Sequence, residues 1–136
     1  MVVPADVVGA AQSLVGSRFR LHGRDPATGV DCVGLVGWAL AAAGRPATVP
    51  QGYALRLRDP WKWREWGERS GLREISGDAE PGDVAVMAVG PGQLHLAIVI
   101  GDGTIVHAHA GLGRVVRSPV PEAWRILGHW RHGPQA

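Results

Sequence analysis

Apolar residues recur at helical spacing in the first half of the chain, whereas the second half alternates between apolar and polar positions. In residues 4–16 the apolar side chains fall every three or four positions, which predicts a helix that Gly16 ends. Residues 33–43 are almost wholly apolar and run into Gly44, so we expect a buried second helix packed on the first. A capped short helix is expected over residues 61–69.

From residue 81 onward, short apolar runs are separated by glycine-containing turns, which is the pattern of consecutive antiparallel strands. We expect strands at residues 83–89, 94–100, 104–109 and 114–118. A last amphipathic piece covers 121–127, and residues 129–131 are expected to add an edge strand. Because the helices precede the strands, the order indicates an α+β fold.

The length of 136 residues fits one domain, 1–136, in which residues 45–77 form an irregular, tryptophan-rich insertion. A single cysteine excludes an intramolecular disulfide and a zinc site built on paired cysteines. The net charge of only +2, with scattered arginines, gives no nucleic-acid signature. We find no Sec-type signal peptide and no apolar run long enough to span a membrane, so synthesis in the cytoplasm is expected.

The only cysteine, Cys32, stands at the start of the predicted apolar helix. Asp31 is a good N-cap residue, which places Cys32 in the first turn, where free backbone N–H groups and the helix dipole favour a thiolate. This placement predicts a nucleophile. The alternative is that Cys32 is simply a small buried apolar residue, as single cysteines usually are.

Three histidines lie in the predicted hairpin. If residues 101–103 form a three-residue loop, His95 faces His109 directly and His107 lies diagonally on the same side, whereas a two-residue loop would exchange the faces. Histidines beside a thiol favour a Cys–His site in which a second histidine orients the first. Two alternatives are partly buried strand residues and a three-histidine metal site, the latter weakened because Asp102 is the hairpin's only carboxylate.

Four stretches resemble the motifs of the NlpC-type cell-wall peptidases, papain-like cysteine hydrolases of peptidoglycan. Residues 29–36, Gly-Val-Asp-Cys-Val-Gly-Leu-Val, resemble the G-x-D-C-S-G-L-V box, and 81–84 resemble the P-G-D-L strand start. Residues 95–103 are similar to H-V-G-I-Y-I-G-D-G, and 105–108 to F-I-H-A. The resemblance implies a papain-like α+β fold, with N-terminal helices carrying the cysteine packed on a small antiparallel sheet carrying the histidines.

The resemblance also implies roles for individual residues. Cys32 is the nucleophile, His95 the general base and His107 the orienting residue, with His109 a second choice. The implied reaction cleaves an amide bond of the peptidoglycan stem peptide through a thioester acyl-enzyme, with no cofactor and no metal.

Two positions depart from the family pattern. Val33 replaces the usual serine after the cysteine, and Phe19 replaces a tyrosine that helps to bind the oxyanion. The backbone N–H of the cysteine remains one donor, and Arg20 or His22 could supply the second. The residues expected around the oxyanion and the substrate are Cys32, Phe19, Arg20, His22 and Asp31.

Within the family, the chain is most similar to short peptidases encoded with tail genes of bacteriophages and gene transfer agents, especially over residues 115–124. This similarity implies tail or baseplate proteins as partners, delivery in a particle, and action in the periplasm or cell wall. Residues 61–69, with three closely spaced tryptophans, are expected to be partly exposed and covered by a tail protein. The alternatives are a catalytically weak structural tail-tip component and an intracellular thiol acyltransferase or amidase.

Overall fold

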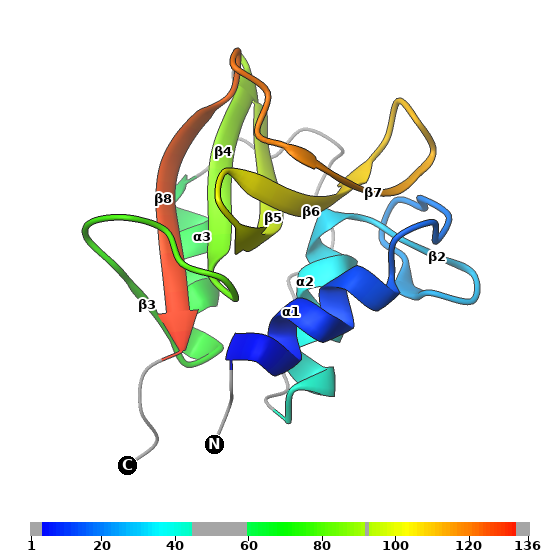
Figure 1. The fold of residues 1–136 in the computed structure, drawn as a ribbon, viewed down its shortest axis with the longest axis horizontal. Helices are drawn as coiled ribbons and strands as arrows, with labels where there is room; N and C mark the ends of the chain where they lie inside the picture. Colours follow the sequence, from blue (N-terminus) through cyan, green and yellow to red (C-terminus); the bar gives the residue numbers. More distant parts are fainter. Residues whose placement is uncertain (1–3, 45–59, 92, 133–136) are drawn as a thin grey trace.

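A computed structural model describes residues 4–44, 60–91 and 93–132, and it places the described helices against a strongly twisted antiparallel sheet (Figure 1). The helices are α1 (Pro4–Ser13), α2 (Cys32–Ala42) and α3 (Pro60–Arg69). All three predicted helices are therefore confirmed. Gly16, at φ 93°, closes the turn that follows α1, a conformation that costs glycine little.

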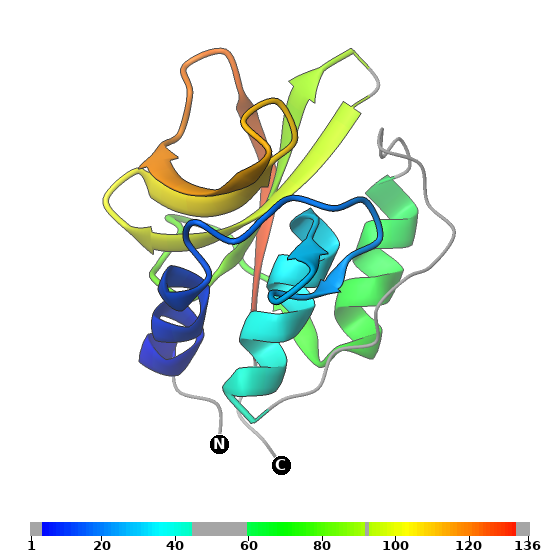
Figure 2. The same ribbon diagram turned by 90° about the vertical axis from the view of Figure 1, so that its right-hand side faces the viewer.

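The three helices lie side by side in Figure 2, and α1 packs against α2 as expected. The side chain of Trp66 in α3 is only 5% exposed, so core packing accounts for this tryptophan. Glu65, Glu68 and Arg69 on the same helix are exposed. The side chains of Trp61 and Trp63 lie outside the described residues, so the expected docking surface stays a prediction. None of the described helices is long and apolar enough to cross a lipid bilayer.

The main sheet has the strand order β3-β8-β4-β5-β6-β7, and each neighbouring pair is antiparallel. Its strands are β3 (Leu72–Glu74), β4 (Val84–Gly90), β5 (Gln93–Gly101), β6 (Thr104–His109), β7 (Arg114–Pro119) and β8 (Arg125–His132). The prediction of an edge strand at 129–131 is wrong, because β8 lies between β3 and β4. Strand β8 also includes residues 125–127, which were expected to belong to the amphipathic piece. Strand β3 was not predicted.

The β5–β6 hairpin combines the two loop geometries that the sequence allowed. Gly101 pairs with Thr104, so the turn itself has two residues, which contradicts the expected three-residue loop. A bulge at Ile100 then shifts the register, and Ile98 pairs with Val106. Beyond the bulge the register is the one that a three-residue loop would give. The histidines therefore lie on the face that a three-residue loop would give them.

Two apolar clusters pack on opposite faces of the sheet. The main core lies between the helices and one sheet face, and it includes Leu35 and Leu40 of α2 and Leu96 of β5. The smaller cluster covers the other face and comprises Ala85, Met87, Ala97, Val99 and Ile105, with Trp124 against it. Because side chains alternate along a strand, His95 and His107 point to the side of the smaller cluster.

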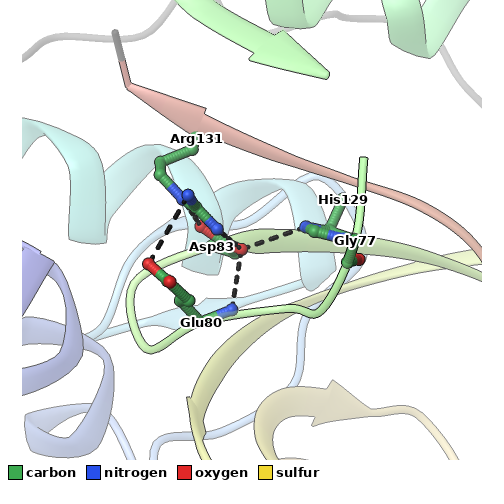
Figure 3. A network of polar contacts seen from close by, with 5 residues as sticks. All are labelled: Gly77, Glu80, Asp83, His129 and Arg131. Atoms are coloured by element: carbon green, nitrogen blue, oxygen red, sulfur yellow. Dashed lines mark hydrogen bonds and ion pairs between the residues drawn. The ribbon is translucent and has the colours of Figure 1, made fainter. Parts of the chain in front are cut away.

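A buried carboxylate joins the start of β4 to β8 (Figure 3). Asp83 is completely buried and accepts two hydrogen bonds from the guanidinium of Arg131, at 2.7 and 2.9 Å. Its Oδ2 also lies 3.0 Å from Nδ1 of His129 and accepts the backbone N–H of Glu80 at 2.9 Å. The other ring nitrogen of His129 bonds to the carbonyl of Gly77 at 2.8 Å. Asp83 is thus fully paired, as burial of a charge requires.

Candidate active site

The helix α2 begins at Cys32 because Asp31 caps it. The Oδ1 atom of Asp31 accepts the backbone N–H of Gly34 at 2.9 Å, which confirms the predicted N-cap. The other oxygen, Oδ2, accepts the backbone N–H of His22 at 2.8 Å, and Arg24 forms an ion pair with Oδ1 at 3.2 Å. Asp31 is 2% exposed, so these bonds fix the residue that precedes the thiol.

The loop that leads to Cys32 is fastened to the edge of the sheet. A small hairpin precedes the helix, formed by β1 (Arg24–Asp25) and β2 (Gly29–Val30). The backbone N–H of Arg20 donates to the carbonyl of Val30 at 3.1 Å, and that of Phe19 donates to the carbonyl of Gly113 at 2.8 Å. Since Gly113 directly precedes β7, these bonds fix the cysteine loop relative to the strands that carry the histidines.

His95 of β5 and His107 of β6 form a direct pair. The Nε2 atom of His95 lies 3.0 Å from Nδ1 of His107, with the rings nearly perpendicular at 88°. His109 contacts the ring of His107 at a centroid distance of 5.7 Å, and its Nδ1 accepts the backbone N–H of Leu112. The structure therefore pairs His95 with His107, and leaves His109 bonded to its own loop.

Trp124 packs edge-on against both members of this pair, with ring centroids 5.4 Å from His95 and 5.2 Å from His107. Trp124 was not among the residues expected at the site. The only signal available was its place in the 115–124 stretch, because a single tryptophan after a strand carries no chemistry of its own. Its indole adds an apolar contact to both histidine rings.

The thiol and the histidine pair border one cavity of about 160 Å³. Its wall consists of Phe19, Leu21, Asp31, Cys32, Val89, Gln93, Leu94, His95, His107, Ala108, His109, Ala110, Gly111 and Trp124. Five of the predicted site residues are therefore brought together here. Arg20 and His22 are exposed and do not belong to the cavity wall. The backbone N–H of His22 instead donates to the side chain of Asp31, the N-cap of α2, and His22 has a positive φ of 63°.

Burial dominates the electrostatics of the site. It raises the pKa of the Cys32 thiol to about 12, although the backbone N–H groups of Leu96 and Val33 oppose this change. Burial also lowers the pKa of His95 to about 3 and that of His107 to about 4, and neighbouring histidines lower both further. The expected thiolate is therefore not the resting form, because desolvation outweighs the helix N-terminus. The site rests as a neutral thiol beside neutral imidazoles.

Among the described residues, no group of three or more histidine, cysteine, aspartate or glutamate side chains is arranged to hold a metal ion. Nε2 of His95 and Nδ1 of His107 are engaged with each other, and Nε2 of His107 lies 3.2 Å from Oγ of Ser118 of β7. The described arrangement is that of a proton-transfer pair beside a thiol.

A buried thiol at a helix N-terminus and a histidine pair on an antiparallel sheet, around one cavity, define a papain-like cysteine hydrolase domain. The chain belongs to the NlpC/P60 family, whose model matches residues 16–126. A comparison with curated protein sequences finds no match.

Solved structures share the fold. The NlpC/p60 domain of the peptidoglycan hydrolase SagA is 26% identical, with a TM-score of 0.64 over 92% of this chain and 97% of that one. The peptidoglycan hydrolase RipB from Mycobacterium tuberculosis is 24% identical, with a TM-score of 0.66 over 93% of this chain and 62% of that one. NlpC1 from Trichomonas vaginalis is 17% identical, with a TM-score of 0.71 over 94% of this chain. The chain spans 44% of the length of NlpC1.

Proposed function

We propose that this protein is a cysteine endopeptidase that cleaves an amide bond in the stem peptide of peptidoglycan. The observation that carries the proposal is the shared cavity, which Cys32 lines together with the hydrogen-bonded pair formed by His95 and His107. Family membership and the similarity to the peptidoglycan hydrolase SagA support the choice of substrate.

The proposed reaction starts from the neutral thiol. The Sγ atom of Cys32 attacks the carbonyl carbon of the scissile amide while its proton passes to Nδ1 of His95, the ring nitrogen that His107 does not occupy. The protonated His95 then gives the proton to the leaving amine as the C–N bond breaks, which leaves a thioester on Cys32. Water, deprotonated by the same imidazole, hydrolyses the thioester and frees the thiol.

The negative charge on the tetrahedral oxygen requires hydrogen-bond donors. The backbone N–H of Cys32, at the N-terminus of α2, is the proposed first donor. Phe19 lines the cavity but has no hydroxyl group to donate, and the exposed side chains of Arg20 and His22 lie outside the cavity wall. The loss of one such donor typically costs on the order of a hundredfold in rate, so we expect a slow enzyme.

The absence of a hydroxyl group at Phe19 favours a second candidate function. In this alternative the protein is a structural component of a tail tip or baseplate that keeps the fold but has weak catalytic activity. We further propose that the protein is part of a phage or gene-transfer-agent tail and acts in the periplasm or cell wall. The support is the sequence similarity over residues 115–124. Mass spectrometry of purified particles would test this placement, and absence of the protein from tail fractions would refute it.

Incubation of the purified protein with muropeptides tests the proposed activity. The wild type should release products that mass spectrometry identifies as cleaved stem peptides, and Cys32→Ala should release none. The control Ser13→Ala changes an exposed residue of the turn at the end of α1 and should match the wild type. If the wild type and Cys32→Ala are equally inactive on a panel of stem-peptide chemistries, the structural role is favoured instead.

A further inference from the structure

A serine on β7 extends the histidine pair by one more hydrogen bond. In the β6–β7 register His107 pairs with Val116 and Ile105 pairs with Ser118, so Ser118 lies diagonally next to His107 on the same face. Its Oγ lies 3.2 Å from Nε2 of His107 and 3.0 Å from the carbonyl oxygen of Pro119. From the sequence, Ser118 was expected only as the last residue of a strand.

The chemistry of these partners restricts where the protons can be. The carbonyl of Pro119 only accepts, so it is satisfied when the single hydroxyl proton of Ser118 points to it. The oxygen of Ser118 then accepts the Nε2–H of His107, which leaves Nδ1 of that ring free to accept the Nε2–H of His95. Nδ1 of His95 is consequently unprotonated, and it can take the proton of the thiol. All three contacts are made in this arrangement.

The opposite arrangement makes one contact fewer. If Ser118 donated to Nε2 of His107, the proton of His107 would be on Nδ1 and would point to Nε2 of His95. The proton of His95 would then occupy Nδ1, and that nitrogen could not act as a base. The carbonyl of Pro119 would also lose its donor. Burial lowers the pKa of both histidines well below neutrality, so each ring carries one proton and its tautomer decides its role.

We propose that Ser118 is a positioning residue: together with the carbonyl of Pro119 it selects the tautomer of His107, and through it the tautomer in which His95 is a base. This inference rests on the proposed peptidase function for its kinetic consequence. The inferred order of hydrogen-bond donors, from His95 through His107 to Ser118, does not depend on that function and applies to the free protein.

The kinetic test compares Ser118→Ala with Ser118→Thr, which keeps the hydroxyl, and with Ser13→Ala. The last variant is a matched control, because Ser13 also donates its hydroxyl to a backbone carbonyl, that of Ala10, far from the histidines along the chain. One net hydrogen bond corresponds to about a fivefold to tenfold population difference. Loss of that preference leaves the two tautomers of His107 about equally populated, so we expect Ser118→Ala to lower kcat about twofold with little change in KM, and Ser118→Thr to restore most of it.

The second test reads the tautomers directly and needs no turnover. In protein with ¹⁵N-labelled histidine at neutral pH, two-bond ¹⁵N–¹H correlation spectra distinguish the protonated from the bare nitrogen of each neutral ring. The wild type and Ser13→Ala should show the Nε2–H form of both His95 and His107, and Ser118→Ala should show a mixture for His107. An Nδ1–H form of His95 in the wild type, or unchanged tautomers in Ser118→Ala, would overturn the inference. An inactive wild type with the expected tautomers would refute only the proposed function.

Discussion

The substitution Gly34→Ala tests how tightly the cysteine helix is seated on its loop. A Cβ atom at Gly34 would lie 2.0 Å from the carbonyl oxygen of Gly23, far inside van der Waals contact. The backbone of Gly23 cannot easily retreat, because a Cβ built there would in turn lie 2.1 Å from the carbonyl oxygen of Gly29. The first turn of α2 and the loop before it are therefore in direct backbone contact.

Two opposite effects decide the size of the change. Alanine is the better helix former, and this gain amounts to about 1 kcal/mol. Forcing a methyl group into a packed site costs about 1–3 kcal/mol, and displacing the N–H of Gly34 from Asp31 Oδ1 weakens an N-cap worth about 1 kcal/mol. The clash and the cap outweigh the propensity, so we expect Gly34→Ala to destabilise the protein by about 2 kcal/mol.

Gly9→Ala provides the matched control, since Gly9 lies within α1 and a Cβ there has nothing within 4 Å. This variant should gain about 0.5–1 kcal/mol from helix propensity alone. Urea denaturation followed by circular dichroism measures both changes, and a thermal scan should show a shift of about 4 °C per kcal/mol for a chain of this size. The reasoning is refuted if Gly34→Ala is as stable as the wild type or gains stability as Gly9→Ala does.

Three further predictions follow from the site and the buried carboxylate. Because burial raises the pKa of Cys32 to about 12, its alkylation by iodoacetamide should still accelerate about tenfold per pH unit above pH 9 in the folded protein; a plateau below pH 9 would contradict this. His107→Ala should lower kcat on the order of a hundredfold and His109→Ala far less, measured on muropeptides, since only His107 bonds to His95; equal losses would contradict the pairing. Asp83→Ala should cost about 3–5 kcal/mol in urea denaturation, because it removes the shared partner of Arg131, His129 and the backbone N–H of Glu80 at once, whereas Arg131→Ala should cost less because Asp83 keeps the other two partners; the reverse order would count against this account.

The elements that the sequence predicted well are those whose pattern is local. The apolar run after Asp31 and the glycines between the strands are visible within a dozen residues, and the structure confirms the helices and four strands there. By contrast, β3 has only three residues, Leu72–Glu74, and too short a pattern to detect. The position of β8 inside the sheet is decided by pairing with β3 and β4, which are distant in the chain, and no local pattern contains that information.

The same distinction applies to the site. Cys32, His95 and His107 could be named because each stands in a short motif, and all three line one cavity. Trp124 and Ser118 could not be named, because each enters the site only through strand pairing and loop closure. The bulge at Ile100 is a further case: nothing in the Gly-Asp-Gly turn shows that an extra residue will restore the register.

The neutral resting state of the site is the reason why His107 and Ser118 matter for the tautomer of His95. If the thiol and His95 formed a stable ion pair, the imidazolium would carry protons on both nitrogens and no tautomer would need to be selected. Burial instead raises the pKa of Cys32 and lowers that of His95, so the proton must move during the attack itself. It can move only if Nδ1 of His95 is bare at that moment. The hydrogen bonds from His95 to His107 and from His107 to Ser118 therefore affect the rate, because they set the fraction of molecules in which Nδ1 of His95 is unprotonated.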